Sequence, residues 1–253
     1  MTFEGIVAVV GATGQQGGAA AWSLLKAGAQ VRALVRDPGK PSAQALASAG
    51  AQLAIADLED PDTIRTAFEG VSRVFLMTTM GSGRGTVGET ADGIAVADAA
   101  EAASVEHLVY SSVGGAERHT GIPHFESKRR VEEHIETLDL EATFVRPTFF
   151  YENLLRQPST REDGAIVVRL PLADDIPLQM VAVKDIGAVA AAVLLDPSRV
   201  PGGSVEIAGD DDLQAMFSWF AQPPSYQADR VLTAELDPQV ENLEQWLARQ
   251  WKP

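Results

Sequence analysis

Short hydrophobic runs recur along the first part of the chain, separated by polar or glycine-rich segments. Several of these runs are continuous instead of alternating, which is the pattern of strands covered on both faces in a parallel sheet. The runs predict six strands, at Ile6–Val10, Val31–Val35, Leu53–Ala56, Val74–Met77, His107–Tyr110 and Thr143–Val145.

Segments with the helical spacing of hydrophobic residues lie between the predicted strands. Their ends carry helix signals, since Gly28 follows the first segment and Asp60 precedes a proline at the start of the third. They predict five helices, at Gly17–Ala27, Ser42–Ala49, Pro61–Phe68, Glu89–Ala103 and Phe125–Leu138. This alternation predicts an α/β fold, a doubly wound parallel sheet of the Rossmann type.

After Arg146 the regular alternation ends, and residues 147–183 contain four prolines and little periodicity. The later elements that the pattern predicts are a helix at Lys184–Leu195, a strand at Ser204–Ala208, an amphipathic helix at Asp210–Phe220 and a final helix at Val240–Trp251. We therefore expect a single domain over residues 1–253. Residues 1–146 would form a dinucleotide-binding core, and residues 147–253 would mostly form a small C-terminal α+β lobe over the carboxyl edge of the sheet.

Composition limits the classes of partner. Acidic residues outnumber basic ones by 35 to 20, so the formal net charge is −15. A field of this sign repels phosphate backbones, and we expect no direct binding of DNA or RNA. The chain has no cysteine, which excludes disulfides, thiolate nucleophiles and cysteine-held metal clusters. His107, His119 and His134 show no ligand spacing, so no metal site is expected either.

No segment has the pattern of a membrane span or a leader. The longest apolar run, Ile186–Leu195, is ten residues long and too short to cross a bilayer. The chain starts Met-Thr-Phe-Glu, without the basic start of a signal peptide. We expect a cytoplasmic protein that does not contact membranes.

The strongest chemical signal is the glycine loop between the first predicted strand and the first helix. Three glycines serve a tight turn, the approach of a pyrophosphate to the backbone, and close packing of helix on strand. The helix start then offers free N–H groups to the anion. A glycine-rich turn without a ligand is the alternative, which the strand–loop–helix context and the further βα units disfavour. The loop residues predicted to bind the dinucleotide are Gly11, Thr13, Gly14, Gln15, Gln16 and Gly17.

The residue at the end of the second predicted strand indicates whether the dinucleotide is NAD(H) or NADP(H). NAD-binding proteins place a carboxylate there for the ribose 2′-hydroxyl, whereas this chain has Arg36, with Lys40 close behind. A charge-assisted bond to a 2′-phosphate is worth about 1.5–3 kcal/mol, which is roughly a 10- to 150-fold preference for NADP(H) over NAD(H). The alternative makes Asp37 the ribose ligand and leaves Arg36 solvated, but Asp37 precedes a proline and is suited to shaping the turn. We expect NADP(H).

Several segments taken together resemble the NmrA-like family. This family is a branch of the atypical short-chain dehydrogenase/reductases that also contains isoflavone-reductase-like enzymes and NADPH:quinone reductases. The resemblance covers nearly the whole chain, although the C-terminal part is shorter than in most relatives, which implies a trimmed substrate lobe. The segments that carry it are Gly11–Gly17, Ala33–Pro38, Ala56–Leu58, Phe125–Lys128 and Arg146–Leu154.

The resemblance implies a role for individual residues around the cofactor. Thr13–Gly17 would wrap the pyrophosphate, and Arg36 would meet the adenosine phosphate, with Lys40 near the family's second basic contact. The remaining implied contacts are Asp57 and Leu58 at the adenine, Thr78 and Thr79 at the ribose, Lys128 at the nicotinamide ribose, and Phe150, Tyr151 and Asn153 at the nicotinamide end.

Reductases of the wider superfamily carry Tyr-x-x-x-Lys on a helix and a serine at the end of the preceding strand. Here Lys128 occupies the lysine position, His124 the tyrosine position, and Ser111 with Ser112 the strand end. Spacing by four residues puts His124 and Lys128 on one helix face. His124 is a candidate proton donor, because its unperturbed pKa of about 6.5 suits proton transfer near neutrality. Two alternatives stay open: a bystander at a helix start, which is the commonest role of a lone histidine beside a proline such as Pro123, and a cofactor contact without catalysis.

Two functions remain open on this sequence. The missing tyrosine favours a redox sensor or regulatory protein that responds to the NADP(H) state and acts on a protein partner. Lys128 and an aromatic group favour an NADPH-dependent reductase of a small quinone, enone or carbonyl compound, with Lys128 or His124 assisting protonation. The aromatic group consists of Phe149, Phe150, Tyr151 and Phe217.

Overall fold

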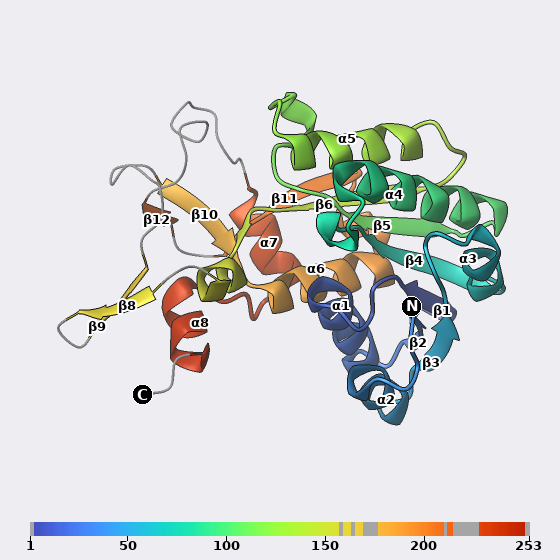
Figure 1. The fold of residues 1–253 in the computed structure, drawn as a ribbon, viewed down its shortest axis with the longest axis horizontal. Coiled ribbons are helices and arrows are strands. Elements are labelled where there is room, and N and C mark those ends of the chain that lie inside the picture. Colours follow the sequence, from blue (N-terminus) through green and yellow to red (C-terminus); the bar gives the residue numbers. More distant parts are fainter. Residues whose placement is uncertain are drawn as a thin grey trace.

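A seven-stranded parallel sheet forms the centre of the protein (Figure 1). The computed structural model describes residues 3–156, 159–162, 165–168, 177–209, 212–214 and 228–250. Along the sheet the strands follow the order β11-β6-β5-β4-β1-β2-β3, and every neighbouring pair is parallel. Their bounds are β1 (Ile6–Val9), β2 (Gln30–Val35), β3 (Gln52–Ile55), β4 (Val71–Met77), β5 (His107–Ser111), β6 (Ala142–Pro147) and β11 (Ser204–Ile207).

Helices cover both faces of this sheet, as Figure 1 shows. Alternate strand residues enter opposite cores: Val7 and Val9 of β1 belong to one cluster, Ala8 and Val10 to the other. The first core is closed by α1 (Gln15–Lys26), α2 (Pro41–Ser48) and α6 (Val183–Leu195), and the second by α3 (Pro61–Ala67), α4 (Gly85–Ala102) and α5 (Pro123–Ile135). The predicted doubly wound α/β fold is thus confirmed. None of the helices in the described ranges is long and apolar enough to span a membrane.

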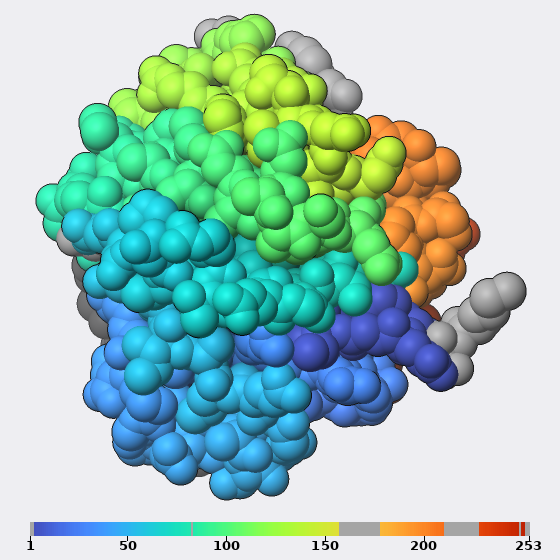
Figure 2. All heavy atoms as spheres, turned by 90° about the vertical axis from the view of Figure 1, so that its right-hand side faces the viewer, coloured from blue at the N-terminus to red at the C-terminus, as the bar shows by residue number. Residues whose placement is uncertain are grey.

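Part of the chain beyond residue 146 completes the central sheet. The strand predicted at Ser204–Ala208 is β11, which pairs with β6, and the helix predicted at Lys184–Leu195 is α6. Figure 2 shows these later residues, coloured orange, packed directly against the green and blue residues of the first half. The regular alternation therefore resumes after an insertion.

The helix predicted over Asp210–Phe220 is wrong where the structure describes it. Residues Asp212–Gln214 form strand β12, which pairs antiparallel with β10 (Pro177–Val181); the other residues of that segment lie outside the described ranges. The open edge of β10 supplies backbone partners, and such tertiary pairing overrides local helical spacing. The final helix is α8 (Leu243–Gln250), and α7 (Arg230–Leu236) precedes it without having been predicted.

A second, smaller layer lies at the left of Figure 1. Its three-stranded sheet has the order β12-β10-β7, with β7 at Phe149–Phe150, and a separate hairpin pairs β8 (Ser159–Glu162) with β9 (Ala165–Val168). A third core cluster fills this layer and includes Tyr151, Met180 and Trp246. Short 3-10 helices occur at η1 (Met80–Ser82), η2 (Ala116–Arg118), η3 (Tyr151–Arg156) and η4 (Pro197–Arg199).

The carboxylate of Glu152 joins three parts of this layer. One oxygen accepts from the backbone N–H of Val183 at 3.0 Å, where α6 begins, and the other accepts from the indole N–H of Trp246 at 3.1 Å. Because Glu152 itself belongs to η3, these two bonds connect η3, α6 and α8. The C-terminal helix is thereby held against the segment that follows β7.

Helices α1 and α6 touch along their main chains at Gly187. A Cβ atom on Gly187 would lie 2.5 Å from Cβ of Ala19 and 2.6 Å from the backbone nitrogen of Ala20. Real Cβ contacts are not that short, so any side chain at this position would force the helices apart. Glycine at 187 therefore sets the spacing of the first core.

We expect Gly187→Ala to lower the free energy of unfolding by about 1–3 kcal/mol, the usual cost of overpacking a core. The gain in helix propensity from glycine to alanine is smaller, roughly 0.5–1 kcal/mol. Urea denaturation followed by circular dichroism measures the change. Gly202→Ala is the matched control, because nothing lies within 4 Å of its added methyl. Equal stability of Gly187→Ala and the unmodified protein would contradict this packing.

Candidate functional site

A cleft of about 780 Å³ opens at the carboxyl ends of β1, β2, β3 and β4. This is the edge of an open α/β sheet at which ligands bind. Most of the predicted cofactor residues share this one surface, although they come from separate parts of the chain. Those on the wall are Gly11, Thr13, Gly14, Gln15, Gln16, Arg36, Lys40, Asp57, Leu58, Thr78, Thr79, Phe150 and Asn153.

The glycine loop brings the start of α1 tightly onto β1. The backbone N–H of Gly14 donates to the carbonyl of Gly11 at 2.8 Å, which closes the turn, and Gly11 has a positive φ of 66°. A Cβ on Gly17 would lie 2.6 Å from the carbonyl oxygen of Val10, so only glycine fits there. Gly17 is thus behind the cleft wall and acts through packing. No acidic side chain stands in the first turn of α1, so its N–H groups keep their positive field for an anion.

Ser111 is placed behind the wall as well. Its side chain is fully buried at the end of β5, and its hydroxyl donates to Oε1 of Gln16 at 2.6 Å. Gln16 does line the cleft. Ser111 therefore orients a wall residue, and its own hydroxyl does not reach the cleft.

Two exposed basic side chains, Arg36 and Lys40, lie at one end of the cleft, just after the carboxyl end of β2. Among the described residues neither makes an ion pair with a carboxylate. The neighbouring Asp37 accepts the backbone N–H of Gly39 at 2.8 Å, a local bond that shapes the turn after β2. Arg36 and Lys40 are thus available to an anionic ligand, whereas Asp37 is engaged in its own loop.

Several charged wall residues escaped the sequence analysis. Arg84, at the start of α4, pairs with Glu59 at 3.2 Å and also with Asp92, and all three line the cleft. Arg156 of η3 donates to Oε1 of Gln15 at 3.2 Å across the opposite part of the wall. These residues belong to no motif, and only the tertiary structure brings them to the cleft.

Lys128 stands just behind Thr78 and does not line the cleft itself. Its ammonium lies 3.4 Å from both the carbonyl and the hydroxyl oxygen of Thr78, and 3.3 Å from the carboxylate of Glu89. The side chain is 12% exposed. Burial lowers the pKa of Lys128, and the negative charge of Glu89 acts in the opposite direction. The lysine is therefore held at the edge of the cleft by a buried carboxylate.

His124 lies in the first turn of α5, four residues before Lys128, and is half-buried. Its ring meets the ring of Phe125 edge-on at 4.7 Å between centroids, and it is not on the cleft wall. Burial lowers the pKa of His124, so the neutral imidazole predominates at neutral pH. This placement favours a packing role over that of a proton donor.

Tyr151 and its neighbours alternate between cleft and core. Phe150 and Asn153 line the cleft, whereas Tyr151 is fully buried and its ring packs 5.6 Å from that of Trp246. Phe149 is partly buried against the same core cluster as Tyr151. The predicted aromatic group is thus divided between two surfaces, and its fourth member, Phe217, lies outside the described residues.

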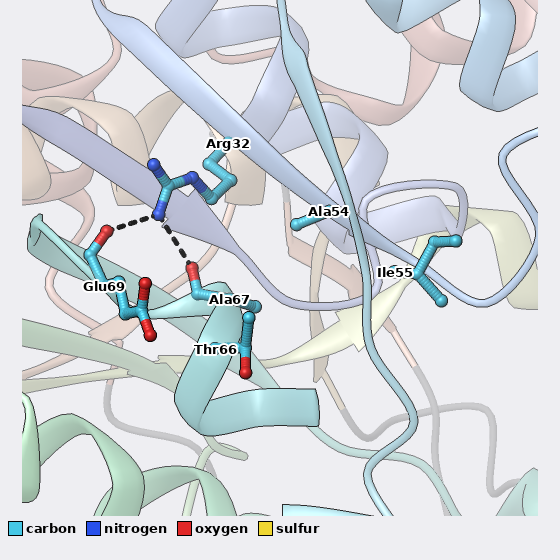
Figure 3. Close-up of a pocket in the computed structure, with 6 residues that line it drawn as sticks. All are labelled: Arg32, Ala54, Ile55, Thr66, Ala67 and Glu69. Atoms are coloured by element: carbon cyan, nitrogen blue, oxygen red, sulfur yellow. Dashed lines mark hydrogen bonds between the residues drawn. The ribbon is translucent and has the colours of Figure 1, made fainter. Parts of the chain in front are cut away.

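A second hollow of about 260 Å³ lies beside the edge strand β3 (Figure 3). Arg32 points into it and donates to the carbonyl oxygens of Ala67 at 3.0 Å and Glu69 at 2.6 Å. The first carbonyl belongs to the last residue of α3 and the second lies two residues beyond it, so the arginine fastens that helix end to β2. Within the described residues no three histidine, aspartate or glutamate side chains are grouped to hold a metal ion.

Comparison with known proteins agrees with this architecture. Residues 4–215 match the NmrA-like family. An NmrA-like family domain-containing oxidoreductase, FrzB from Cladobotryum, is 30% identical over 86% of this chain and 73% of its own length. The NAD(P)H azoreductase of Xenophilus azovorans is 31% identical, over 77% of this chain and 65% of its own. Quinone oxidoreductase 2 of Escherichia coli is 32% identical, over 81% of this chain and 69% of its own.

Solved structures show the same fold. The crystal structure of NmrA, a negative transcriptional regulator, in complex with NADP has a TM-score of 0.81 over 98% of this chain and 95% of that chain, at 22% identity. The same regulator in complex with NAD also gives 0.81, at 22% identity. The match over most of the sequence, together with relatives that are 30–32% identical, shows that this chain belongs to the NmrA-like family.

Proposed function

We propose that the protein binds NADP(H) in the cleft at the carboxyl edge of the sheet. The cleft volume of about 780 Å³ falls in the usual range for small-molecule sites. The cleft wall has the groups that a dinucleotide needs. The glycine loop and the start of α1 expose backbone N–H groups for a pyrophosphate, and Arg36 and Lys40 supply positive charge at the other end of the cleft. The NmrA structures with NADP and with NAD, together with the NAD(P)H azoreductase, support a dinucleotide as the ligand.

Individual residues would divide the contacts with this ligand. The loop Thr13–Gln16 at the start of α1 would hold the pyrophosphate through backbone N–H groups. Arg36 and Lys40 would hold the 2′-phosphate, while Asp57 and Leu58 would flank the adenine. Thr78, with Lys128 behind it, would meet the nicotinamide ribose, and Phe150 and Asn153 would border the nicotinamide. When bound, NADPH supplies a hydride.

We further propose that the protein is an NADP(H)-responsive regulatory protein. The observation that carries this proposal is the position of His124, which occupies the tyrosine position of the reductases: it does not line the cleft, and its ring packs against Phe125. Positioned general acids contribute about 10²–10⁴-fold to a rate, so a reductase would benefit from one at the nicotinamide end. A regulatory protein would transmit the redox state of the cofactor to a protein partner.

The second candidate is an NADPH-dependent reductase of a small quinone, enone or carbonyl compound. It is favoured by the relatives named as oxidoreductases. Phe150 and Met77 also give the cleft wall apolar surface. Lys128 is then the residue nearest to the cleft that could assist protonation through Thr78.

Arg36→Asp should weaken NADPH binding by roughly 10- to 150-fold while NADH binding changes far less, because only NADPH carries the 2′-phosphate. Fluorescence titration of both cofactors measures the two dissociation constants. Arg65→Asp makes the same charge change on the exposed surface of α3 and serves as the control. Equal losses for NADPH and NADH would contradict the role of Arg36.

Gly14→Val should abolish binding of both cofactors, since its side chain would fill the space through which a pyrophosphate approaches the loop. Isothermal titration calorimetry measures the affinity, and circular dichroism verifies the fold. Gly18→Ala, four residues further along, is the control, because its added Cβ would make only an ordinary contact of 3.4 Å with the carbonyl of Ala12. Unchanged affinity in Gly14→Val would refute the assigned site.

The two functions differ in what NADPH does to the protein. A regulatory protein must respond differently to NADP⁺ and NADPH, since a ligand shifts a conformation only through differential binding. We expect hydrogen-exchange patterns that differ between the two complexes, and no NADPH consumption with a panel of quinones, enones and aldehydes. Turnover that falls in Lys128→Ala would establish a reductase instead. Identical exchange patterns with both cofactors would contradict the regulatory role.

A further inference from the structure

A buried carboxylate, Glu89, lies directly behind the cleft on α4. Its residue is 1% exposed. One oxygen accepts the hydroxyl of Ser127 at 2.5 Å; the other lies 3.3 Å from the Lys128 ammonium and 3.4 Å from the Thr78 hydroxyl. Glu89 thus gathers groups from α5 and from the end of β4 around a single charge.

The ammonium of Lys128 is enclosed between this carboxylate and the end of β4. Thr78 presents its carbonyl and hydroxyl oxygens, each at 3.4 Å, and the hydroxyl is also 3.2 Å from that of Tyr110. The ring of Tyr110 lies below, with its centroid 5.6 Å from Nζ. Thr78 lines the cleft. Glu89 is therefore connected to the cleft through the Lys128 ammonium and the Thr78 hydroxyl.

The charge of Lys128 depends on its surroundings. Burial lowers the pKa of a lysine, because an ammonium loses its hydration, whereas an adjacent carboxylate raises it. The groups that face it are Glu89 from α4 and, more distantly, Glu132 from its own helix. Tyr110 of β5 remains neutral, since burial raises its pKa far above the physiological range. Lys128 in turn lowers the pKa of His124. Glu89 is therefore the principal group that keeps this buried lysine protonated.

We propose that Glu89 is a positioning residue for Lys128: its carboxylate holds the lysine as a charged ammonium against Thr78, and so equips the cleft edge to bind the ribose hydroxyls of NADP(H). This inference rests on the proposed function, which assigns Lys128 to the nicotinamide ribose. Glu89 belongs to none of the motifs in the sequence, and it acts on the cofactor only through Lys128.

Competitive labelling of the cofactor-free protein tests the first half of the proposal. Acetic anhydride modifies the neutral amine of Lys128, and peptide mass spectrometry follows its labelling between about pH 6 and about pH 10, around the unperturbed lysine value. In Glu89→Gln the labelling profile of Lys128 should move to lower pH, so that more of this residue reacts at neutral pH. An unchanged profile would overturn the positioning role and would leave the proposed NADP(H) site intact.

NADPH titration at about pH 6 and about pH 9 tests the second half. The measured quantity is the NADPH affinity of Glu89→Gln divided by that of the unmodified protein. This ratio should be near one at the lower pH, where Lys128 is protonated in both proteins. At the higher pH the ratio should fall about 10-fold, because the variant loses one charge-assisted hydrogen bond to the cofactor. The ratio removes the titration of the cofactor itself. A purely structural role for Glu89 would weaken binding equally at both pH values and would overturn the proposal.

Three further variants separate the possible causes. Asp185→Asn is the matched control, because Asp185 is also 1% exposed and pairs with Lys184 at 3.3 Å, far from the cluster; it should leave Lys128 labelling unchanged. Glu89→Asp keeps the charge, should restore most of the normal profile, and preserves the test if Glu89→Gln fails to fold. If Lys128→Ala binds NADPH normally, the ribose role of Lys128 is refuted, and the proposal with it.

Discussion

Close contact between main chains at both sides of α1 is the constraint on which the rest of the structure depends. On one side Gly17 brings the helix onto the carbonyl of Val10, and on the other Gly187 of α6 meets Ala19 and Ala20. Neither contact tolerates a side chain, so α1 has a single position relative to the sheet. The glycine loop connects β1 to this helix, so the position of α1 also fixes the loop and the cleft wall that the loop forms.

The segment after β6 serves cleft and core together. Phe150 and Asn153 face the cleft, and Tyr151 and Leu154 enter the third core. Glu152 accepts hydrogen bonds from the start of α6 and from the indole of Trp246 in α8. A change in this segment would therefore disturb the packing of α8 as well as the cleft wall. Much of the family motif in this region consequently has a structural role here.

Local and global charge act in opposite senses in this protein. The net charge of −15 repels polyanions at a distance, but such a field is screened beyond about 8 Å at physiological salt. Arg36 and Lys40 line the cleft and form no ion pair within the described part of the chain, whereas Arg84 is paired with Glu59 and Asp92. The cleft thus offers uncompensated positive charge at one end to a small anion.

The sequence by itself determined the central architecture and most of the cleft wall. Short continuous hydrophobic runs that alternate with helical segments are typical of strands in a parallel sheet, and the loops that follow such strands meet at its carboxyl edge. That is why Gly14 and Arg36 could be assigned to one surface in advance, whereas Thr78 was assigned to it by the resemblance to the NmrA-like family. Tertiary structure decided the rest. It paired Asp212–Gln214 with β10 against the local helical spacing, and turned Tyr151 into the core. It also brought Glu89 of α4 to Lys128 of α5, 3.3 Å apart although 39 positions separate them in the chain. Such contacts depend on how two helices pack against each other, which no pattern within either helix specifies.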